Sequence, residues 1–242
     1  MRSTKIIVAF HGAVTHSEAF RDPEFYYPVY GGKDISLHLP KILQEMQGDN
    51  EGENISWANP YVGEVTCFYW AAKHLDKIGS PEMIGLNHYR RLFPIRLMQR
   101  ELEQHDKENY ILTTTKPLGI PVLVAAESLY GLGELTTRVL THICQSDEDK
   151  TLLREFVQRR EYAEKNLFVI PVKEVEGYIN CIEQAVEFLA SYFRLQGAYG
   201  AAYTRLPARV MEFVTGFYLY KLSRKGYERL VTKYEYPWRQ FA

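Results

Sequence analysis

The stretch 84–93 carries the side chains best suited to chemistry. An apolar run ends at Leu86 and is followed directly by Asn87-His88-Tyr89-Arg90-Arg91, which bring an amide, an imidazole, a phenol and two guanidiniums. Two guanidiniums suit a diphosphate, because each offers a planar fork of donors that matches phosphate oxygens and stays charged at any working pH. The alternative is that both arginines are solvated loop charges and that His88 is a hydrogen-bonded buried imidazole.

Glu64 and Asp49 are the carboxylates that could act as a general base. Glu64 lies in the segment 61–75, whose apolar residues recur at helical spacing, and at about 100° per residue it falls beside the apolar stripe. A carboxylate that points inward either pairs with a cation such as Arg90 or has a raised pKa, and both situations are common in active sites. A purely structural ion pair is the alternative. Asp49 lies in a polar, glycine-punctuated loop, 48–56.

Strands that end near one another are needed to bring these side chains together. Lys5–Phe10 and Met83–Leu86 have the short apolar runs of buried parallel strands, and His11 and His88 follow them. Ligands gather beyond the carboxyl ends of such strands in α/β proteins. We therefore expect a nucleotide to bind beside these histidines.

The remaining pattern predicts one α/β domain over residues 1–242, with a mostly parallel central sheet flanked by helices and with helices at the C-terminal end. Further strands are expected at 110–114, 121–125 and 166–171. Helices are expected at 59–75 (with Asn59 as its cap), 127–143, 150–165, 175–193 and 209–222. The stretch 15–39 lacks periodicity and is interpreted as a long loop.

Composition narrows the class of protein. The chain has 29 Lys+Arg against 30 Asp+Glu, a balance that gives no indication of nucleic-acid binding. Its three cysteines form no short metal-type pair and would leave one unpaired after any disulfide, which favours a reducing compartment; we expect them to be buried and inert. No apolar run is long enough for a membrane span or a usual secretion signal, so a cytoplasmic location is expected.

Two charged segments have alternative interpretations. Asp147-Glu148-Asp149 matches the Asp-x-Asp pattern that holds a divalent metal in many sugar-nucleotide enzymes, but it follows Ser146 at a predicted helix start, where caps and acids belong. We therefore predict no metal site there. The tail 221–242 has six basic against two acidic residues, with aromatic residues between them. It could rest on an anionic membrane surface as a peripheral contact, or be a solvated end.

An ordered set of motifs resembles one protein family. The motifs are Lys5–His11, Gly48-Asp49-Asn50, Asn54-Ile55-Ser56, Asn59-Pro60, Glu64 with Tyr69-Trp70, Ile84-Gly85-Leu86, His88-Tyr89-Arg90-Arg91 with Phe93, and Asn166-Leu167-Phe168. Members of that family carry a domain of formally unknown function and are usually labelled capsular or exopolysaccharide biosynthesis glycosyltransferases. The resemblance implies a glycosyltransferase-A-like fold, a nucleotide-sugar donor, and transfer to a growing surface polysaccharide or lipopolysaccharide. Some relatives are similar to galactofuranosyltransferases, which adds UDP-galactofuranose to the candidate UDP-sugar donors.

The sequence departs from the family pattern in two places. Relatives usually continue past the first histidine with Lys-Pro-Tyr, whereas His11 is followed by Gly12-Ala13-Val14. Their last helix commonly carries a Glu-Arg pair, and the matching stretch here is Thr215-Gly216-Phe217.

The residues and the resemblance together suggest a mechanism. His88, Arg90 and Arg91 would stabilise the leaving nucleoside diphosphate without a metal; Mn²⁺ or Mg²⁺ is not indicated. In an inverting transfer, Asp49 or Glu64 would take the proton of the acceptor hydroxyl. The residues expected to bind the nucleotide or sugar hydroxyls are His11, Asn54, Ser56, Tyr69, Asn87, Tyr89 and Asn166.

Two other function classes remain open. One is a nucleotide- or glycan-binding protein that has lost catalysis, suggested by the missing Glu-Arg pair. The other is a metal-dependent hydrolase or phosphotransferase that uses the acidic loop around Asp49 as ligands. Chelation would abolish the activity of the second class, whereas a transfer assisted by arginines would continue.

Overall fold

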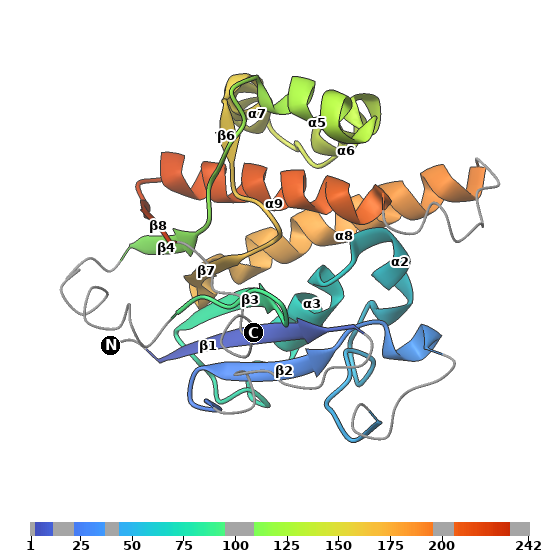
Figure 1. The fold of residues 1–242 in the computed structure, drawn as a ribbon, viewed down its shortest axis with the longest axis vertical. Helices are drawn as coiled ribbons and strands as arrows, with labels where there is room; N and C mark the ends of the chain where they lie inside the picture. The colour runs from blue at the N-terminus through green and yellow to red at the C-terminus, as the bar shows by residue number, and fades with distance from the viewer. Residues whose placement is uncertain (1–2, 12–21, 37–43, 95–108, 196–205, 233–242) are drawn as a thin grey trace, which may run out of the picture.

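The computed structural model describes residues 3–11, 22–36, 44–94, 109–195 and 206–232 (Figure 1). Its strands are β1 Thr4–Phe10, β2 Tyr26–Tyr30, β3 Met83–His88, β4 Tyr110–Thr113, β5 Lys116–Pro117, β6 Glu161–Tyr162, β7 Phe168–Pro171 and β8 Glu228–Val231. Its α-helices are α2 Asn59–Val62, α3 Val65–Lys73, α5 Val122–Tyr130, α6 Gly133–His142, α7 Asp147–Gln158, α8 Val175–Leu195 and α9 Leu206–Arg224. The predicted mixed α/β class is confirmed.

The central sheet has the strand order β2-β1-β3-β7-β4-β8. β7 runs antiparallel to its neighbours β3 and β4, and the other pairs are parallel. The register of β1 with β3 pairs Ala9 with His88, so the residues that follow these strands emerge side by side. His11 and His88 therefore lie close together at the carboxyl ends of two neighbouring parallel strands, with their ring centres 6.0 Å apart.

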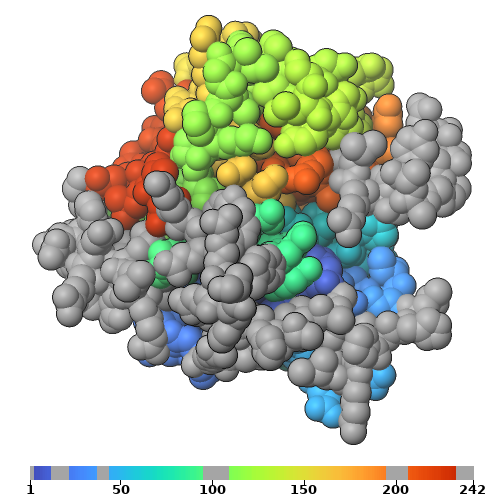
Figure 2. Space-filling model, viewed as in Figure 1, coloured from blue at the N-terminus to red at the C-terminus, as the bar shows by residue number. Residues whose placement is uncertain are grey.

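Helices and sheet form successive layers (Figure 1). α8 and α9 run across the molecule beside the sheet, and the α5–α7 group lies on the side of α9 away from the sheet. A buried apolar cluster joins one face of the sheet to α3, α8 and α9. The space-filling view shows the α5–α7 residues at one end of the molecule and residues of the N-terminal strands toward the other (Figure 2). The long helices thus connect the sheet with an outer helical group.

β2 corrects the interpretation of 15–39 as a loop. Its sequence, Tyr-Tyr-Pro-Val-Tyr, lacks alternation of apolar and polar residues and contains Pro28, which cannot donate to a neighbouring strand. Pro28 is tolerated because β2 is the first strand in the order and pairs with β1 on one side only. Its outer side is covered in part, since the backbone N–H of Tyr26 donates to Asp22 and that of Tyr30 to Gln47.

The predicted helix 59–75 is divided into α2 and α3. Gly63 has φ +61° and ψ −138°, a conformation that side chains disfavour, and the chain turns there. Asn59 does not act as the N-terminal cap; its Nδ2 donates to the carbonyl of Gly63 and to Thr66 Oγ1, at 2.9 and 3.0 Å, and so ties the two helices together. Glu64 follows the turn and becomes the first residue flanking α3.

Two further expectations are wrong. The apolar run 121–125, predicted as a strand, forms the start of α5, which ends at the left-handed Gly131. The predicted helix 150–165 starts and stops earlier, as α7, because Ser146 caps it and the chain then enters β6. The tail includes β8, which pairs with β4 at the opposite edge of the sheet from β2.

Candidate functional site

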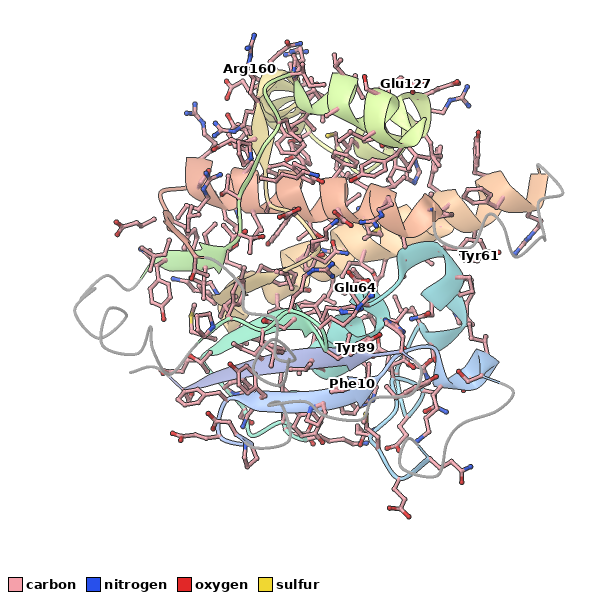
Figure 3. All side chains as sticks on the ribbon, in the orientation of Figure 1. Phe10, Tyr61, Glu64, Tyr89, Glu127 and Arg160 are labelled. Atoms are coloured by element: carbon pink, nitrogen blue, oxygen red, sulfur yellow. The ribbon has the colours of Figure 1, made fainter. Side chains whose placement is uncertain are left out.

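A cavity of about 480 Å³ lies where β1 and β3 end. From the sheet side it is lined by His11, His88, Tyr89, Arg90 and Arg91, and from the helical side by Asn59, Gly63, Glu64, Lys165, Arg209 and Glu212. Figure 3 shows Glu64 between the long helices and the sheet, with Tyr89 and Phe10 toward the sheet. Six of the predicted site residues therefore share one cavity: His11, Glu64, His88, Tyr89, Arg90 and Arg91.

Arg90 is held in place without a carboxylate partner. Its backbone N–H and its Nε donate to His88 Nδ1 at 3.2 and 3.5 Å, and its guanidinium carbon lies 5.4 Å from the centre of the Tyr89 ring. Nothing in the described part of the chain forms a salt bridge with Arg90. Because His88 accepts at Nδ1, that nitrogen carries no proton in this geometry. His88 therefore orients Arg90, whose charge stays available to an anion.

Glu64 is partly buried, and one of its two carboxylate oxygens is anchored. Oε1 accepts a hydrogen bond of 3.0 Å from Nδ2 of Asn166, a residue that is 1% exposed. Burial raises the pKa of Glu64 above its usual value, while the hydrogen bonds from its own backbone and from Asn166 act in the opposite direction. A carboxylate in such surroundings is suited to accept a proton near neutral pH.

Sequence reasoning missed one wall of the cavity, formed by Lys165, Arg209 and Glu212. In this wall the Glu212 carboxylate forms ion pairs with the Lys165 and Arg209 side chains. Its Oε1 accepts from Arg209 Nη1 at 2.5 Å, and its Oε2 lies 3.9 Å from Lys165 Nζ and accepts from the Lys165 backbone N–H at 3.1 Å. Glu212 is 4% exposed. A signal was present, because Glu212 falls among the apolar residues Val210, Phe213 and Val214, where an unpaired carboxylate would be costly.

Asp49 is fully buried in a hydrogen-bond network outside the cavity. Its carboxylate accepts from the backbone N–H groups of Gly32 and Lys33, at 2.8 and 3.1 Å, and from Ser56 Oγ at 2.6 Å. Asn54 belongs to the same network, since its Oδ1 accepts from the backbone N–H of Ser56. Three donors occupy both oxygens of Asp49, so this geometry favours a structural role for Asp49, Asn54 and Ser56 over base, ligand or metal-binding roles.

The other three predicted residues also lie outside the described cavity lining. Asn87 is fully buried, and its Oδ1 accepts from the backbone N–H of Phe93 at 2.9 Å, which shapes the turn that carries Arg90. Tyr69 donates to Glu183 on α8 at 2.8 Å; burial and that carboxylate raise its pKa to about 12. Asn166 does not line the cavity, but its side chain donates a hydrogen bond to Glu64, which does.

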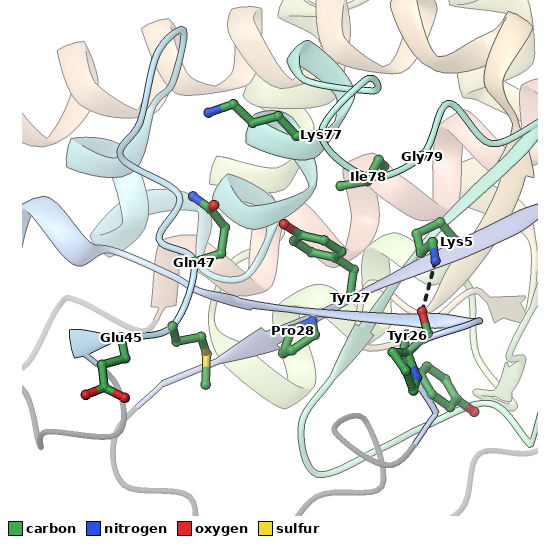
Figure 4. Close-up of a pocket in the computed structure, with 11 residues that line it drawn as sticks. Lys5, Tyr26, Tyr27, Pro28, Glu45, Gln47, Lys77, Ile78 and Gly79 are labelled. Carbon is green, nitrogen blue, oxygen red and sulfur yellow. Dashed lines mark hydrogen bonds between the residues drawn. The ribbon is translucent and has the colours of Figure 1, made fainter.

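A larger hollow of about 630 Å³ opens beside β2, and its lining is different (Figure 4). Tyr27, Gln47 and Lys77 are among its lining residues. Its cations already have partners: Lys5 Nζ donates to the carbonyls of Pro23 and Glu24, and Lys77 lies 3.3 Å from Glu51. The hollow near Lys5 is at the amino end of β1, whereas the cavity with Glu64 and Arg90 is at the carboxyl ends of the strands.

Other predictions can be checked over the described ranges. Ser146 Oγ accepts from the backbone N–H of Asp149 at 3.0 Å, which confirms the capping interpretation of the Asp-x-Asp pattern. No group of three or more His, Cys, Asp and Glu side chains with metal-binding geometry occurs among the residues that the structure describes. The cysteines are buried; burial raises the pKa of Cys144 and of Cys181 to about 11.

The basic tail lies partly outside the described residues, which end at 232. Within them, its basic side chains form ion pairs with acids of the fold: Lys221 with Asp149, Arg224 with Glu155, Lys225 with Glu174 and Arg229 with Glu161. Contact of the tail with a membrane stays a prediction. Across the described ranges, no helix combines the length and apolar character that crossing a bilayer requires.

Comparisons with known proteins add the family and a structural likeness. The structure is similar to the apo structure of the bifunctional glycosyltransferase WbbM, with a TM-score of 0.69 and 19% sequence identity; the match covers 98% of this chain and 46% of that chain. The chain thus spans about half the length of WbbM, and the glycosyltransferase-A-like fold prediction is confirmed. A search of curated proteins finds no match. The model of the family described as "Domain of unknown function (DUF4422)" matches residues 5–223, so the chain belongs to the DUF4422 family, as the motifs predicted.

Proposed function

We propose that this chain is a glycosyltransferase that takes a sugar from a nucleotide-sugar donor and attaches it to a hydroxyl group of a glycan acceptor. The observation that carries the proposal is one cavity in which the arginines Arg90 and Arg91 share the lining with the carboxylate Glu64. The fold supports it, because the structurally similar WbbM is a glycosyltransferase. Fold alone does not define a reaction, so the argument rests on the side chains.

The arginines suit the leaving group. As the bond between the anomeric carbon and the diphosphate breaks, its electron pair stays on the diphosphate, and preorganised cations are most effective where such charge develops. Arg90 already has its orientation fixed by His88, and none of the described residues forms a salt bridge with it. Arg91 lines the same cavity. Together they provide two charges for the two phosphates.

Glu64 suits the acceptor. In a single displacement with inversion, the acceptor oxygen bonds to the anomeric carbon while its proton passes to a base. Glu64 is preferred to Asp49 for this role, because Asp49 is fully buried and both of its oxygens are occupied. Asn166 anchors Oε1 of Glu64, and the carboxylate lines the cavity in which the acceptor hydroxyl would approach it.

The finer proposal concerns the substrates. The donor is a UDP-sugar, with UDP-galactofuranose as one candidate, and the acceptor is a growing surface polysaccharide or lipopolysaccharide. Both come from the family resemblance. The identities of the donor and the acceptor are tested by assaying the protein with several nucleotide sugars and several glycans.

Binding is tested first, by thermal shift with UDP, GDP, CMP and their sugars, each with and without Mn²⁺. A specific ligand at a hundredfold excess over its dissociation constant stabilises the fold by roughly 2.7 kcal/mol. We expect UDP and UDP-sugars to raise the melting temperature without Mn²⁺. Arg90→Ala should weaken UDP binding at least about tenfold, as expected for loss of a charge-assisted contact. Arg138→Ala, at an exposed surface pair with Glu134, is the matched control.

Turnover is tested next with the donor that binds. Glu64→Gln should lower the transfer rate at least about tenfold while leaving donor binding intact. Binding without product for any acceptor would favour a protein that has lost catalysis. Activity that disappears with chelator, and that Arg90→Ala leaves unchanged, would favour a metal-dependent hydrolase or phosphotransferase. If no nucleotide binds, the proposed donor class is wrong.

A further inference from the structure

A strained turn lies directly behind Glu64. Lys165 and Asn166, the residues leading into β7, have φ angles of +64° and +52°. Residues other than glycine seldom adopt this left-handed conformation, which costs on the order of 1 kcal/mol for each residue, so the surrounding structure must hold the turn. Glu212 on α9 does so by accepting the backbone N–H of Lys165 at 3.1 Å.

A chain of hydrogen bonds connects this turn to the core. Asn166 Oδ1 accepts from Thr215 Oγ1 at 2.7 Å, and Tyr178 OH lies 2.6 Å from the same Thr215 oxygen. A threonine hydroxyl has one proton. Because Thr215 donates it to Asn166, Tyr178 must donate to Thr215.

The direction of these bonds determines the orientation of the Asn166 amide. Its oxygen is occupied by Thr215, so its NH₂ group is the end that faces Glu64 and donates to Oε1 at 3.0 Å. Asn166 and Thr215 are each 1% exposed, and Tyr178 is 1% exposed, so water does not compete for these bonds. The described residues contribute no second side-chain donor to Glu64.

We infer that Asn166 and Thr215 are positioning residues for Glu64: Thr215 fixes the Asn166 amide so that its NH₂ group holds one oxygen of the Glu64 carboxylate in the charged form. The inference adds positioning residues to the proposed transfer reaction. Their catalytic role rests on the proposed function of Glu64 as the base. It assigns a role to the α9 stretch Thr215-Gly216-Phe217, at which the family pattern is broken. Thr215, which stands where relatives carry the Glu-Arg pair, is the residue that donates to Asn166.

The electrostatic surroundings agree with this role. Burial is the main cause that raises the pKa of Glu64, and the Asn166 hydrogen bond lowers it. Charged or titratable groups face Glu64 from each neighbouring element. They are Arg209 and Glu212 from α9, Cys67 from α3, Tyr178 from α8, Lys165 from the turn before β7, and, across the cavity, His11, His88, Arg90 and Arg91. Glu212 and Arg209 act in opposite directions. The backbone of Glu64 and the side chain of Asn166 are thus the neutral groups whose hydrogen bonds stabilise the carboxylate against burial, and Asn166 is the side chain among them.

Thr215→Val tests the inference, because it removes the hydroxyl and keeps the shape. Without its donor, Asn166 Oδ1 is free to turn toward Glu64, and an acceptor there favours the protonated acid. The matched control is Thr136→Val on α6: Thr136 is also fully buried, and its hydroxyl has no hydrogen-bond partner among the described residues. Thr215→Ser keeps the hydroxyl and should behave as the parent protein does.

The readout is the titration of the Glu64 carboxyl carbon by ¹³C NMR, assigned with Glu64→Gln. We expect the midpoint to move upward in Thr215→Val, with no movement in Thr136→Val or Thr215→Ser. The transfer rate of Thr215→Val should fall about tenfold near pH 6 and recover in alkali, with an unchanged KM for the donor.

An unmoved midpoint in Thr215→Val would overturn the inference, even if the protein became less stable. Asn166→Gly, which tolerates the φ of +52° and removes the amide that donates to Glu64, gives a second measurement should Thr215→Val not fold, and its midpoint should also rise. Tyr178→Phe leaves the Thr215–Asn166 bond in place, so its midpoint should not move. Failure of the proposed function is a separate result. It would appear as a parent protein that neither binds nor turns over any nucleotide sugar, whatever the NMR midpoint shows.

Discussion

At the residue scale, the two candidate bases differ in how their oxygens are used. Asp49 has three donors on its carboxylate and no exposed surface, whereas Glu64 has a single side-chain donor and lines a cavity. Both are candidate bases in the sequence, and the structure separates them by the number of donors on each carboxylate. A satisfied carboxylate stabilises the fold, and an incompletely satisfied one costs stability and is reactive.

Glu64→Gln should make the protein more stable at neutral pH. The pKa of Glu64 is raised above its usual value of 4.5 in the folded protein, so the folded state binds the proton more tightly than the unfolded state does. The contribution of Glu64 to stability therefore falls as pH rises through and above that value. A gain of order 1 kcal/mol would raise the melting temperature by about 2–4 °C for a chain of this size. Differential scanning calorimetry of both proteins should show the gain at neutral pH and none in acid; a gain that persists in acid would contradict the assignment to ionisation.

Asp49→Asn should act on stability rather than on the pH dependence of activity. The amide presents an NH₂ group to donors that need an acceptor, so about 2–3 kcal/mol of unfolding free energy should be lost. Urea unfolding measures the change. Glu134→Gln, at an exposed pair with Arg138, should change the free energy by less than about 0.5 kcal/mol. Equal stability of Asp49→Asn and the parent would show that the network around Gly32 is dispensable.

At the element scale, the site depends on breaks in regular structure. Gly63 ends α2 so that Glu64 can begin α3, and the left-handed Asn166 precedes β7. Periodicity predicted one continuous helix, since a single glycine within a helical pattern is often tolerated. The predicted continuous helix also pointed Glu64 toward the interior. In the structure, the turn at Gly63 gives Glu64 that direction.

Gly63→Ala tests that turn. A Cβ at Gly63 would lie 3.2 Å from the Cβ of Ala208 on α9, and the φ of +61° is itself unfavourable for alanine. We expect a loss of about 1–3 kcal/mol in urea unfolding. Gly79→Ala, with φ +89° and nothing within 4 Å, should show the backbone cost alone. If both substitutions cost the same, the contact between Gly63 and α9 is not tight.

The sequence predicted the features that depend on neighbouring residues and missed those that depend on residues far apart in the chain. Short apolar runs located β1, β3 and β7, and amphipathic stripes located α8 and α9, because burial on a strand or a helix leaves a pattern of apolar residues in the sequence. β2 was missed because an edge strand with Pro28 has little of that trace. The Lys165–Glu212–Arg209 wall was missed because it joins residues far apart in the chain, and no spacing rule connects a turn before β7 to a turn of α9.

At the scale of the whole molecule, the layers differ in how much they bury. α8 contributes many buried apolar side chains to the core, among them Ile182, Ala185 and Leu189, whereas Phe156 is the buried residue of α7. α7 lies in the outer helical group beyond α9 (Figure 1). Opening of α7 should therefore expose less apolar surface than opening of α8.

Native-state hydrogen exchange should resolve this difference. Amides of α7 should exchange with opening free energies at least about 2 kcal/mol below those of α8, because local opening costs less than global unfolding. Mass spectrometry of peptides covering 147–158 and 175–193 gives both values in one experiment. Equal protection of the two helices would indicate that the outer group and the core unfold as one cooperative unit.

The outer side of β2 has a consequence for behaviour at high concentration. Exposed sheet edges invite strands of other molecules, which leads to fibrous aggregation unless donors along the edge are removed. On this edge the Tyr26 and Tyr30 amides are already bonded within the chain, and Pro28 between them has no amide hydrogen. An invading strand would meet carbonyl oxygens but no backbone donors along Tyr26–Tyr30. Pro28, which made β2 resemble a loop in the sequence, thus helps to protect the folded protein from self-association at that edge.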